Sequence, residues 1–270
     1  MTKVVLVTGA SSGLGKALCE RLSQSGFRVY GTSRNPDAYQ LPFPLLALDV
    51  TDPAGINRVV EQVITENGRI DVLINNAGVG MAAPLEKGAA ADVEQLFRIN
   101  VFGTLQVCQA VLPHMRAAGT GMILNVSSIG GSVGLPFRGA YCASKAALDM
   151  LTETLRLEVK HFGIEVGTIP AGDMRTPIKQ HWIGGYRPET DHTYGDDYRL
   201  VTKAIEADNE RGMSPQAVAA RIEQLIRSER IGRSTVVGKP LQRLAITAKR
   251  LLPDAWFEKI ILKHSKLNNS

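Results

Sequence analysis

The chain has 270 residues, of which 44% are hydrophobic and 21% charged, and this composition indicates a globular protein rather than a disordered or fibrous one. Its net charge of +5 is concentrated in the C-terminal tail, so the near-neutral body lacks the basic face of a nucleic-acid-binding protein, and we expect no nucleic acid as a partner. The three cysteines, Cys19, Cys108 and Cys142, follow no metal-ligand spacing and favour a reduced compartment, so we expect a cytoplasmic protein that holds no metal.

Short apolar runs alternate with helical patterns along the chain. The runs predict strands at Val4–Thr8, Arg28–Thr32, Leu45–Leu48, Val72–Ile74, Met122–Val126, Glu165–Ile169 and Thr235–Val237. The helical patterns predict helices at Leu14–Ser25, Pro53–Asn67, Ala91–Ala117 (with a break near Asn100), Ala140–Phe162 and Pro215–Arg227. We therefore predict one α/β catalytic domain over residues 1–238, with a Rossmann-type, doubly wound, parallel seven-stranded sheet and helices on both faces.

The segment from Lys179 to Gly212 shows no sustained periodicity. A structureless segment of this length inside a compact domain is usually functional, often as a lid over a site. The alternative is a disordered insertion, but disordered segments are poor in aromatic residues. This one contains Trp182, Tyr186, Tyr194 and Tyr198. We predict a substrate lid over residues 179–212.

The last part of the chain, residues 239–270, predicts a basic amphipathic helical extension. Apolar residues recur there at helical spacing: Leu241, Leu244, Ala245, Ala248, Leu251 and Leu252, then Trp256, Ile260 and Ile261 after Pro253. Between Leu241 and Lys266 stand six Lys/Arg and two acids, which gives +4. Such helices can lie on anionic membranes, although they more often pack on their own domain or on a partner subunit. All three arrangements stay open, and membrane association would here be peripheral, because no apolar stretch approaches the ~18–20 residues of a membrane span.

A glycine-rich turn follows the first predicted strand and opens the first helix. It reads Thr8-Gly9-Ala10-Ser11-Ser12-Gly13-Leu14-Gly15. Glycines let the backbone turn sharply and approach a pyrophosphate, whose negative charge then meets the helix N-terminus. The predicted dinucleotide contacts are Gly9, Ser11, Ser12, Gly13, Leu14 and Gly15. The spacing differs from the G-x-G-x-x-G fingerprint, and a purely structural turn is the alternative.

Four further motifs follow in order. They are Asn75-Asn76-Ala77-Gly78, then Asn100-Val101-Phe102-Gly103, then Ser128, and then Tyr141-Cys142-Ala143-Ser144-Lys145. With the glycine-rich turn they resemble the short-chain dehydrogenase/reductase family over roughly residues 3–176. The resemblance implies an NAD(P)-dependent oxidoreductase that transfers a hydride between nicotinamide and an alcohol, ketone or aldehyde. The stretch Gly134-Leu135-Pro136-Phe137 looks like the hydroxysteroid and retinol dehydrogenase branch, which suggests an apolar substrate.

Tyr141 and Lys145 are four residues apart on a predicted helix, so their side chains share one face. A free tyrosine has a pKa of about 10 and is a poor base at neutral pH. A nearby ammonium and the positive ring of an oxidised nicotinamide favour the phenolate, which makes Tyr141 the predicted general acid/base. Ser128 would orient the substrate oxygen, with Ser127 as the competing candidate. The resemblance implies that Asn100 holds a water that relays protons to Lys145, and a capping or kinking asparagine is the alternative.

The end of the second strand predicts NADP(H) in preference to NAD(H). Ser33 stands where NAD enzymes of the family place an acid, and Arg34 follows. A carboxylate would repel the 2′-phosphate of NADP, whereas an arginine can form a bidentate contact with it. A solvated loop arginine is the alternative reading of Arg34.

The resemblance implies the remaining contacts. Those to the cofactor are Asp49, Val50, Asn76, Ala77, Gly78, Tyr141, Lys145, Gly172 and Thr176, although the family's Pro-Gly reads Ala171-Gly172 here. The candidate substrate contacts are Met81, Leu135, Met174, Trp182 and Tyr186. We expect a homodimer or homotetramer. A catalytically idle dinucleotide sensor or scaffold is the alternative function, and the intact Ser128, Tyr141 and Lys145 disfavour it.

Overall fold

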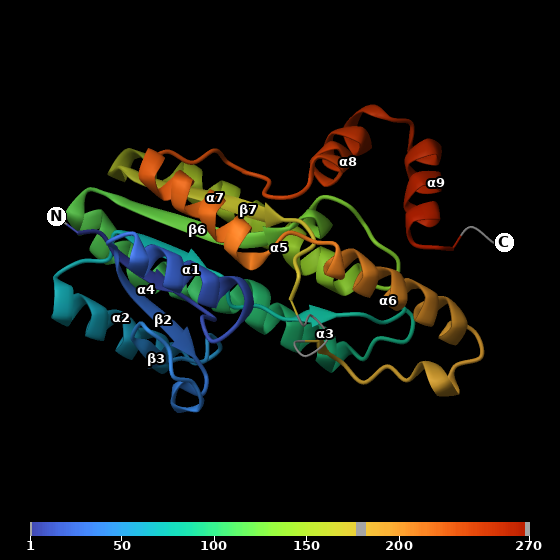
Figure 1. The fold of residues 1–270 in the computed structure, drawn as a ribbon, viewed down its shortest axis with the longest axis horizontal. Coiled ribbons are helices and arrows are strands. Elements are labelled where there is room, and N and C mark those ends of the chain that lie inside the picture. Colours follow the sequence, from blue (N-terminus) through green and yellow to red (C-terminus); the bar gives the residue numbers. More distant parts are fainter. Residues whose placement is uncertain (1, 177–181, 268–270) are drawn as a thin grey trace.

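A computed structural model of the protein describes residues 2–176 and 182–267. Six parallel strands form its central sheet in the order β3-β2-β1-β4-β6-β7 (Figure 1). Their bounds are β1 Val4–Val7, β2 Arg28–Ser33, β3 Leu45–Ala47, β4 Val72–Asn75, β6 Gly121–Ser128 and β7 Ile164–Ala171. The strands β1 and β4 are buried along their whole length, as expected of apolar runs in a parallel sheet that is covered on both faces.

Helices cover both faces of the sheet, and others extend beyond it. In chain order the helices are α1 Gly13–Gln24, α2 Pro53–Asn67, α3 Ala90–Phe97, α4 Thr104–Ala118, α5 Gly139–Val159, α6 Gly195–Glu210, α7 Pro215–Ser228, α8 Pro240–Leu251 and α9 Asp254–His264. One core lies between the sheet and helices α1 and α7, and a second lies between the opposite face and α2, α4 and α5. The predicted doubly wound fold is therefore confirmed (Figure 1).

Local signals explain where these helices begin and end. Asp52 accepts a hydrogen bond from the Ala54 N–H at 3.0 Å and caps α2, and Pro53 fills the first helical position, where no N–H partner is needed. Gly68 ends the same helix at a φ of 73°, in the left-handed region that favours glycine. Ser214 and Pro215 begin α7 in the same way as Asp52 and Pro53 begin α2.

The predicted seventh strand, Thr235–Val237, lies beside β7 but forms only two isolated parallel bridges with it, Thr168 with Ser234 and Ala171 with Val237. Backbone hydrogen bonds join the two segments on either side of Pro170, and the Pro170 carbonyl accepts from the Val237 N–H at 3.0 Å. Proline has no N–H to donate, so the ladder loses one bond at Pro170. The continuous strand that we expected is therefore interrupted at this residue.

The segment predicted as an aperiodic lid contains more structure than expected. Residues 179–181 lie outside the described part, and the rest holds β8 Trp182–Ile183, a short 3₁₀ turn at Pro188–Thr190 and the 16-residue helix α6. The prediction of a loop was therefore wrong over α6. This helix buries only a few side chains, Val201 and Thr202 among them, so its sequence carries too weak an apolar stripe to reveal it.

The two ends of that segment meet at its base. Met174 and Met213 form a parallel bridge, and the Arg175 N–H donates to the Met213 carbonyl at 3.0 Å. Near the start of the segment, β8 pairs with β5 Gly80–Met81. The segment is thus joined to the body at its base and through β8, beside the carboxyl ends of the central strands.

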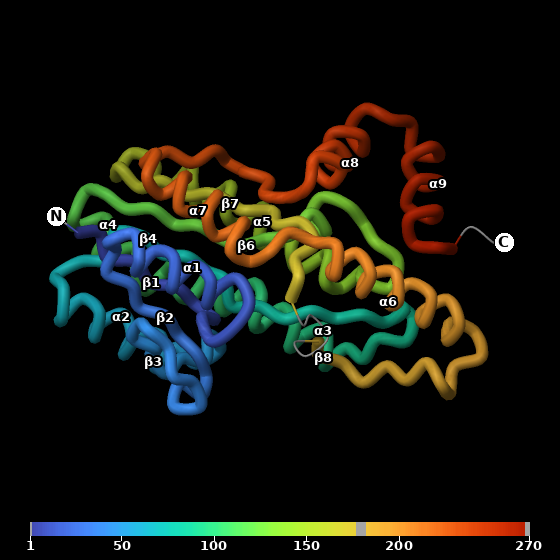
Figure 2. The backbone as a smooth tube through the Cα atoms, in the orientation of Figure 1, coloured from blue at the N-terminus to red at the C-terminus, as the bar shows by residue number. Residues whose placement is uncertain are grey.

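The predicted tail forms two helices, α8 and α9, separated at Pro253. The backbone trace shows them standing out from the body at the end of the molecule opposite the N-terminus (Figure 2). None of the helices in the described ranges combines the length and apolar character that crossing a bilayer requires.

Candidate active site

The Ser128 and Tyr141 side chains meet beside Gly130. Ser128 is the last residue of β6, and Tyr141 lies in the first turn of α5. A methyl group built on Gly130 would lie 3.4 Å from Ser128 Oγ and 3.6 Å from Tyr141 Cε1, so both side chains border the same small space. The Gly130 N–H donates to Ser128 Oγ at 3.1 Å and fixes the serine rotamer. The hydroxyl that would orient a substrate therefore stands next to the ring that would exchange its proton.

Lys145 lies one turn further along α5 and is buried, with a relative exposure of 7%. Its ammonium donates to the Val126 carbonyl at 3.1 Å. A methyl group on Gly78 would lie 3.6 Å from Lys145 Nζ and 3.1 Å from Asn100 Oδ1. Lys145 and Asn100 are thus brought together at Gly78, although they lie 45 positions apart in the chain.

Asn100 lies in a π-helical segment, Arg98–Gly103, that joins α3 to α4. The predicted break in a single long helix is therefore real, and its physical form is an extra residue in the helical turn, a feature common at functional sites. The Asn100 side chain accepts from the Val79 N–H and donates to the Val79 carbonyl, both at 2.9 Å. These two bonds hold the amide beside Lys145.

Arg138 is a site residue that the sequence analysis missed. It is 8% exposed and lies just before α5, and its guanidinium carbon stands 4.5 Å from the centre of the Tyr141 ring. Burial, and then the nearby Asp208, raise the pKa of Asp173, and the Arg138 charge opposes that rise. The sequence did contain a sign of this contact. Arg138 and Tyr141 are three positions apart, which puts both side chains on one side of the first helical turn.

The glycine-rich turn has the geometry that a pyrophosphate needs. Gly9 has a φ of 68°, and a Cβ there would lie 2.8 Å from the Ala77 backbone, so only glycine fits. A Cβ on Gly15 would lie 2.1 Å from the Gly9 carbonyl oxygen, because the helix packs directly on the turn. Ser12 makes no side-chain cap on α1, which leaves N–H groups of the first helical turn available to an anion. The Asn76 side-chain amide donates a hydrogen bond to the Gly9 carbonyl at 2.8 Å and so stabilises the turn.

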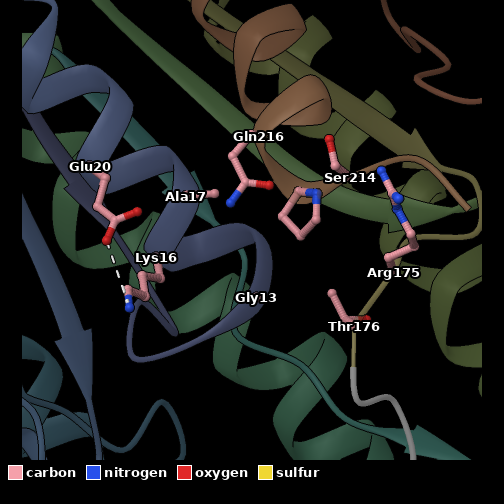
Figure 3. Close-up of a pocket in the computed structure, with 9 residues that line it drawn as sticks. Gly13, Lys16, Ala17, Glu20, Arg175, Thr176, Ser214 and Gln216 are labelled. Atoms are coloured by element: carbon pink, nitrogen blue, oxygen red, sulfur yellow. Dashed lines mark ion pairs between the residues drawn. The ribbon is translucent and has the colours of Figure 1, made fainter. Parts of the chain in front are cut away.

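A pocket of about 500 Å³ opens at this helix N-terminus (Figure 3). It is lined by Gly13, Lys16, Ala17, Glu20, Arg175, Thr176, Ser214, Pro215 and Gln216. The side chain of Thr176 faces Gly13, since a methyl group on that glycine would lie 3.5 Å from Thr176 Cγ2. Two cationic side chains that the sequence analysis did not assign to the site, those of Lys16 and Arg175, also line the pocket, and Lys16 forms an ion pair with Glu20 at 3.7 Å (Figure 3). The pocket thus suits a phosphate group held by backbone donors and cations.

The residues predicted to hold the adenosine half lie on the other side of the turn. Ser33 ends β2, and the exposed Arg34 follows it, without an ion-pair partner among the described residues. The Asp49 carboxylate accepts from the Thr51 N–H and hydroxyl at 2.8 and 2.7 Å, and so orders the loop after β3. Val50 is buried, where it packs on Gly103. Arg34 is therefore free to meet a phosphate.

The candidate substrate residues divide into two groups. Met81 and Tyr186 share one apolar cluster with Tyr141. Trp182 lies close by in β8, with its indole 2.6 Å from where a Cβ on Gly80 would stand. Met174 instead packs against the core beneath α7, and Leu135 lies in the turn before α5, where its carbonyl accepts from the Arg138 N–H.

Phe137 is a further residue that the sequence analysis did not place in the site. Its φ of 59° is rare for a bulky residue, and its carbonyl accepts from the Ala83 N–H at 2.8 Å. Its ring contacts the rings of Tyr198 and Tyr194 edge-on, with centroids 5.9 and 6.3 Å apart. Tyr194 and Tyr198, which follow β8 in the chain, thus pack directly on Phe137, the residue before Arg138. Over the described ranges, no group of His, Cys, Asp and Glu side chains has metal-ligand geometry.

Comparison with known proteins agrees with this geometry. A family model described as short chain dehydrogenase matches residues 3–185. The 3-ketodihydrosphingosine reductase of Bacteroides thetaiotaomicron is 39% identical over 252 residues, which are 93% of this chain and 94% of the relative. The chain belongs to the short-chain dehydrogenase/reductase family. It is accordingly an NAD(P)-dependent oxidoreductase that acts on CH–OH or C=O groups.

Two further similarities extend over almost the whole family member. The NADPH-dependent 3-dehydrocapnine reductase of Ornithobacterium rhinotracheale is 30% identical, over 98% of this chain and 98% of the relative. The crystal structure of a short-chain dehydrogenase from Streptomyces avermitilis is similar with a TM-score of 0.81 and 30% identity, and covers 100% of this chain and 98% of that one. The matches therefore include α6 and the tail helices as well as the sheet.

Proposed function

We propose that the protein uses NADPH to reduce a ketone carried on a long apolar chain, with Tyr141 as the proton donor. The observation that carries this proposal is the position of Tyr141, whose ring borders Ser128 Oγ at Gly130 and also belongs to the apolar cluster of Met81 and Tyr186. The hydroxyls of Ser128 and Tyr141 can bind one carbonyl, and the apolar cluster beside them can contact an alkyl chain. This arrangement suits a substrate in which an alkyl chain is attached to a ketone.

The relatives support the substrate class. Two of them are named for reducing 3-ketodihydrosphingosine and 3-dehydrocapnine. A sphingoid ketone joins a polar amino-alcohol head to a long alkyl chain, and such a molecule would place its carbonyl at the polar end of the apolar cluster. One relative's name also states NADPH, which agrees with the reading of Ser33 and Arg34.

The residues at hand can hold the cofactor. We assign the pyrophosphate to the glycine-rich turn, with Gly9, Ser11, Ser12, Gly13, Leu14 and Gly15, and the 2′-phosphate to Ser33 and Arg34. The adenine falls to Asp49 and Val50, and the nicotinamide half to Asn76, Ala77, Gly78, Gly172 and Thr176, with Tyr141 and Lys145 contributing from α5. The uncapped N-terminus of α1 and the close packing of Gly9 and Gly15 support this assignment.

When bound, NADPH would supply the hydride that the carbonyl carbon takes up. Ser128 donates a hydrogen bond to the carbonyl oxygen and stabilises the negative charge that develops there. Tyr141 gives its hydroxyl proton to the same oxygen, which completes the alcohol. The Lys145 ammonium on the next helical turn stabilises the phenolate that remains. Asn100, held beside Lys145, positions the path by which Tyr141 regains a proton from solvent.

A substrate assay that follows NADPH absorbance tests the proposal. A long-chain 3-keto sphingoid base, kept soluble in detergent, is compared with an analogue that has the same head and a short chain. We expect the long-chain ketone to give the higher kcat/KM, and the Tyr141→Phe variant to lose about 10²–10⁴-fold in turnover while binding NADPH as the wild type does. Activity of Tyr141→Phe within threefold of the wild type, or no preference for the long chain, would contradict the proposal.

A further inference from the structure

Polar contacts on their inner sides hold the helices α8 and α9 on the body, at the loops that follow β7 and β6 and at α6. In α8, the Gln242 side chain donates to the carboxylate of Asp173, and the Lys249 ammonium donates to the Ser132 carbonyl at 2.7 Å. In α9, His264 lies 3.3 Å from the Asp208 carboxylate of α6, and Phe257 is buried. The two helices therefore have a fixed orientation, and their outer sides face away from the body.

The outer sides of both helices carry large apolar side chains that are exposed to water. Leu241 and Leu251 are each 77% exposed and Leu244 60%, and these three residues lie on one side of α8. On α9, Trp256 is 65% exposed and Ile260 50%. We call these five residues the tail face. Large exposed apolar side chains that share one side of a helix mark an interaction site rather than ordinary surface scatter.

Basic side chains accompany the tail face. Lys259 and Lys263 share the outer side of α9 with Trp256 and Ile260, and Arg243 and Arg250 of α8 are exposed as well. The stretch from Leu241 to Lys266 holds +4 of the chain's net +5. A second copy of the chain would bring the same positive charges together if it bound through this face, which disfavours self-association. An anionic lipid surface complements both the charge and the apolar residues.

We propose that the tail face docks on anionic membranes, with Trp256 and the leucines of α8 in the headgroup region and the basic side chains on the lipid phosphates. Trp is suited to that depth because its ring is apolar while its N–H needs a polar partner. Because α8 touches Asp173 and Ser132, in the loops that follow β7 and β6, docking would hold these two loops near the lipid surface. That this position serves to take a long-chain substrate from the lipid rests on the proposed function, whereas the docking itself does not.

Vesicle flotation of the full chain tests the proposal. The probes are vesicles of phosphatidylcholine alone and of phosphatidylcholine with phosphatidylserine. We expect binding to the mixed vesicles that weakens as salt is raised, and at least a tenfold loss of binding in the Leu244→Ser/Trp256→Ser variant. The matched control is Leu200→Ser, which removes a 48% exposed leucine from α6 and should leave vesicle binding unchanged.

Fluorescence gives a second readout of the same contact. The chain has two tryptophans, so Trp182→Phe leaves Trp256 as the only one, and its emission should shift to the blue when mixed vesicles are added. The proposal would be overturned by equal flotation of wild type and the double variant, by no shift of Trp256 emission, or by a tail face that proves to join two copies of the chain in sedimentation. Vesicle binding without reduction of the long-chain ketone would leave the docking standing and refute the proposed function. Ketone reduction in detergent without vesicle binding would do the reverse.

Discussion

Two cationic residues flank Tyr141 in the chain: Arg138 precedes it and Lys145 follows it. The Arg138 guanidinium lies over the Tyr141 ring, and both cations are buried. A positive charge close to a phenol favours its ionised form. The predicted base is therefore served by two positive groups, of which the sequence analysis identified one.

Removing Arg138 should weaken the support of the Tyr141 ring. Arg138→Met takes away a cation that stands 4.5 Å from the centre of that ring, a contact that contributes about 1–2 kcal/mol when it is partly desolvated. We expect kcat/KM for ketone reduction to fall roughly 5- to 30-fold in Arg138→Met and to recover in large part in Arg138→Lys, which keeps a cation. An Arg138→Met variant with the kcat/KM of the wild type would show that this contact does not serve the reaction.

Cofactor preference should also depend on two residues. In the double variant Ser33→Asp/Arg34→Ile the 2′-phosphate of NADP loses a charged donor and meets a carboxylate, while the ribose of NAD gains an acceptor. A charge-assisted hydrogen bond contributes about 1.5–3 kcal/mol, so NADPH affinity should fall roughly 10- to 100-fold. Kd values for NADPH and NADH measured by titration check this. A wild type that already binds NADH more tightly would show that Arg34 is a solvated surface residue.

At the scale of elements, the segment after β7 is built around α6 and a group of tyrosines. The Tyr186 and Tyr198 rings lie 4.7 Å apart by centroid, and Tyr194 donates its hydroxyl hydrogen bond to Glu86 at 2.8 Å. Burial and a bond to Asp191 raise the pKa of Tyr186 to about 12, so it stays neutral at physiological pH. The segment therefore presents neutral aromatic surface to the site, joined to the body through polar contacts at its rim.

We predict that residues 182–212 act as the lid. Cofactor and substrate together should slow hydrogen exchange in α6, because closure excludes water and completes the apolar wall. Replacing Tyr186 and Tyr198 by serine should raise KM for bulky apolar ketones far more than for small ones and should leave NADPH affinity unchanged. Equal exchange protection of α6 in the free protein and in the ternary complex would mean that this segment is a fixed wall.

At the scale of the whole molecule, a second apolar surface lies far from the tail face in sequence. Met150, Leu151 and Leu157 of α5 are 63%, 39% and 70% exposed, and Phe102, in the adjoining π-helical segment, is 51% exposed. Met150 and Leu157 are seven residues apart and so share one side of α5. This surface belongs to the near-neutral body of the chain and not to the basic tail.

We predict that the expected homo-oligomer forms through this α5 surface. Leu157→Glu should then dissociate it, since two copies would bury like charges at the contact. Molar mass by light scattering after gel filtration checks this, with Leu241→Glu in the tail face as the control that keeps the wild-type mass. A monomeric wild type, or a Leu157→Glu variant of unchanged mass, would contradict the prediction.

The features that could be predicted from the sequence are those that are local in the chain. The strand that runs into the glycine-rich turn, the spacing of Tyr141 and Lys145, and the break at Asn100 could be predicted because each depends on a few neighbouring residues. Short-range geometry then fixes which side chains share a turn or a face.

Other features depend on which distant segment covers a residue, and they could be seen only in the folded chain, because packing sets them. Folding has four such results. It put the Arg138 charge over Tyr141, brought Asn100 to Lys145 at Gly78, formed α6 from a sequence with almost no apolar stripe, and left Leu241, Leu251 and Trp256 uncovered. Burial and exposure are set by contacts between residues tens to hundreds of positions apart. A local pattern shows that a helix has an apolar side, but the packing of the whole chain decides whether that side meets a core, a partner or solvent.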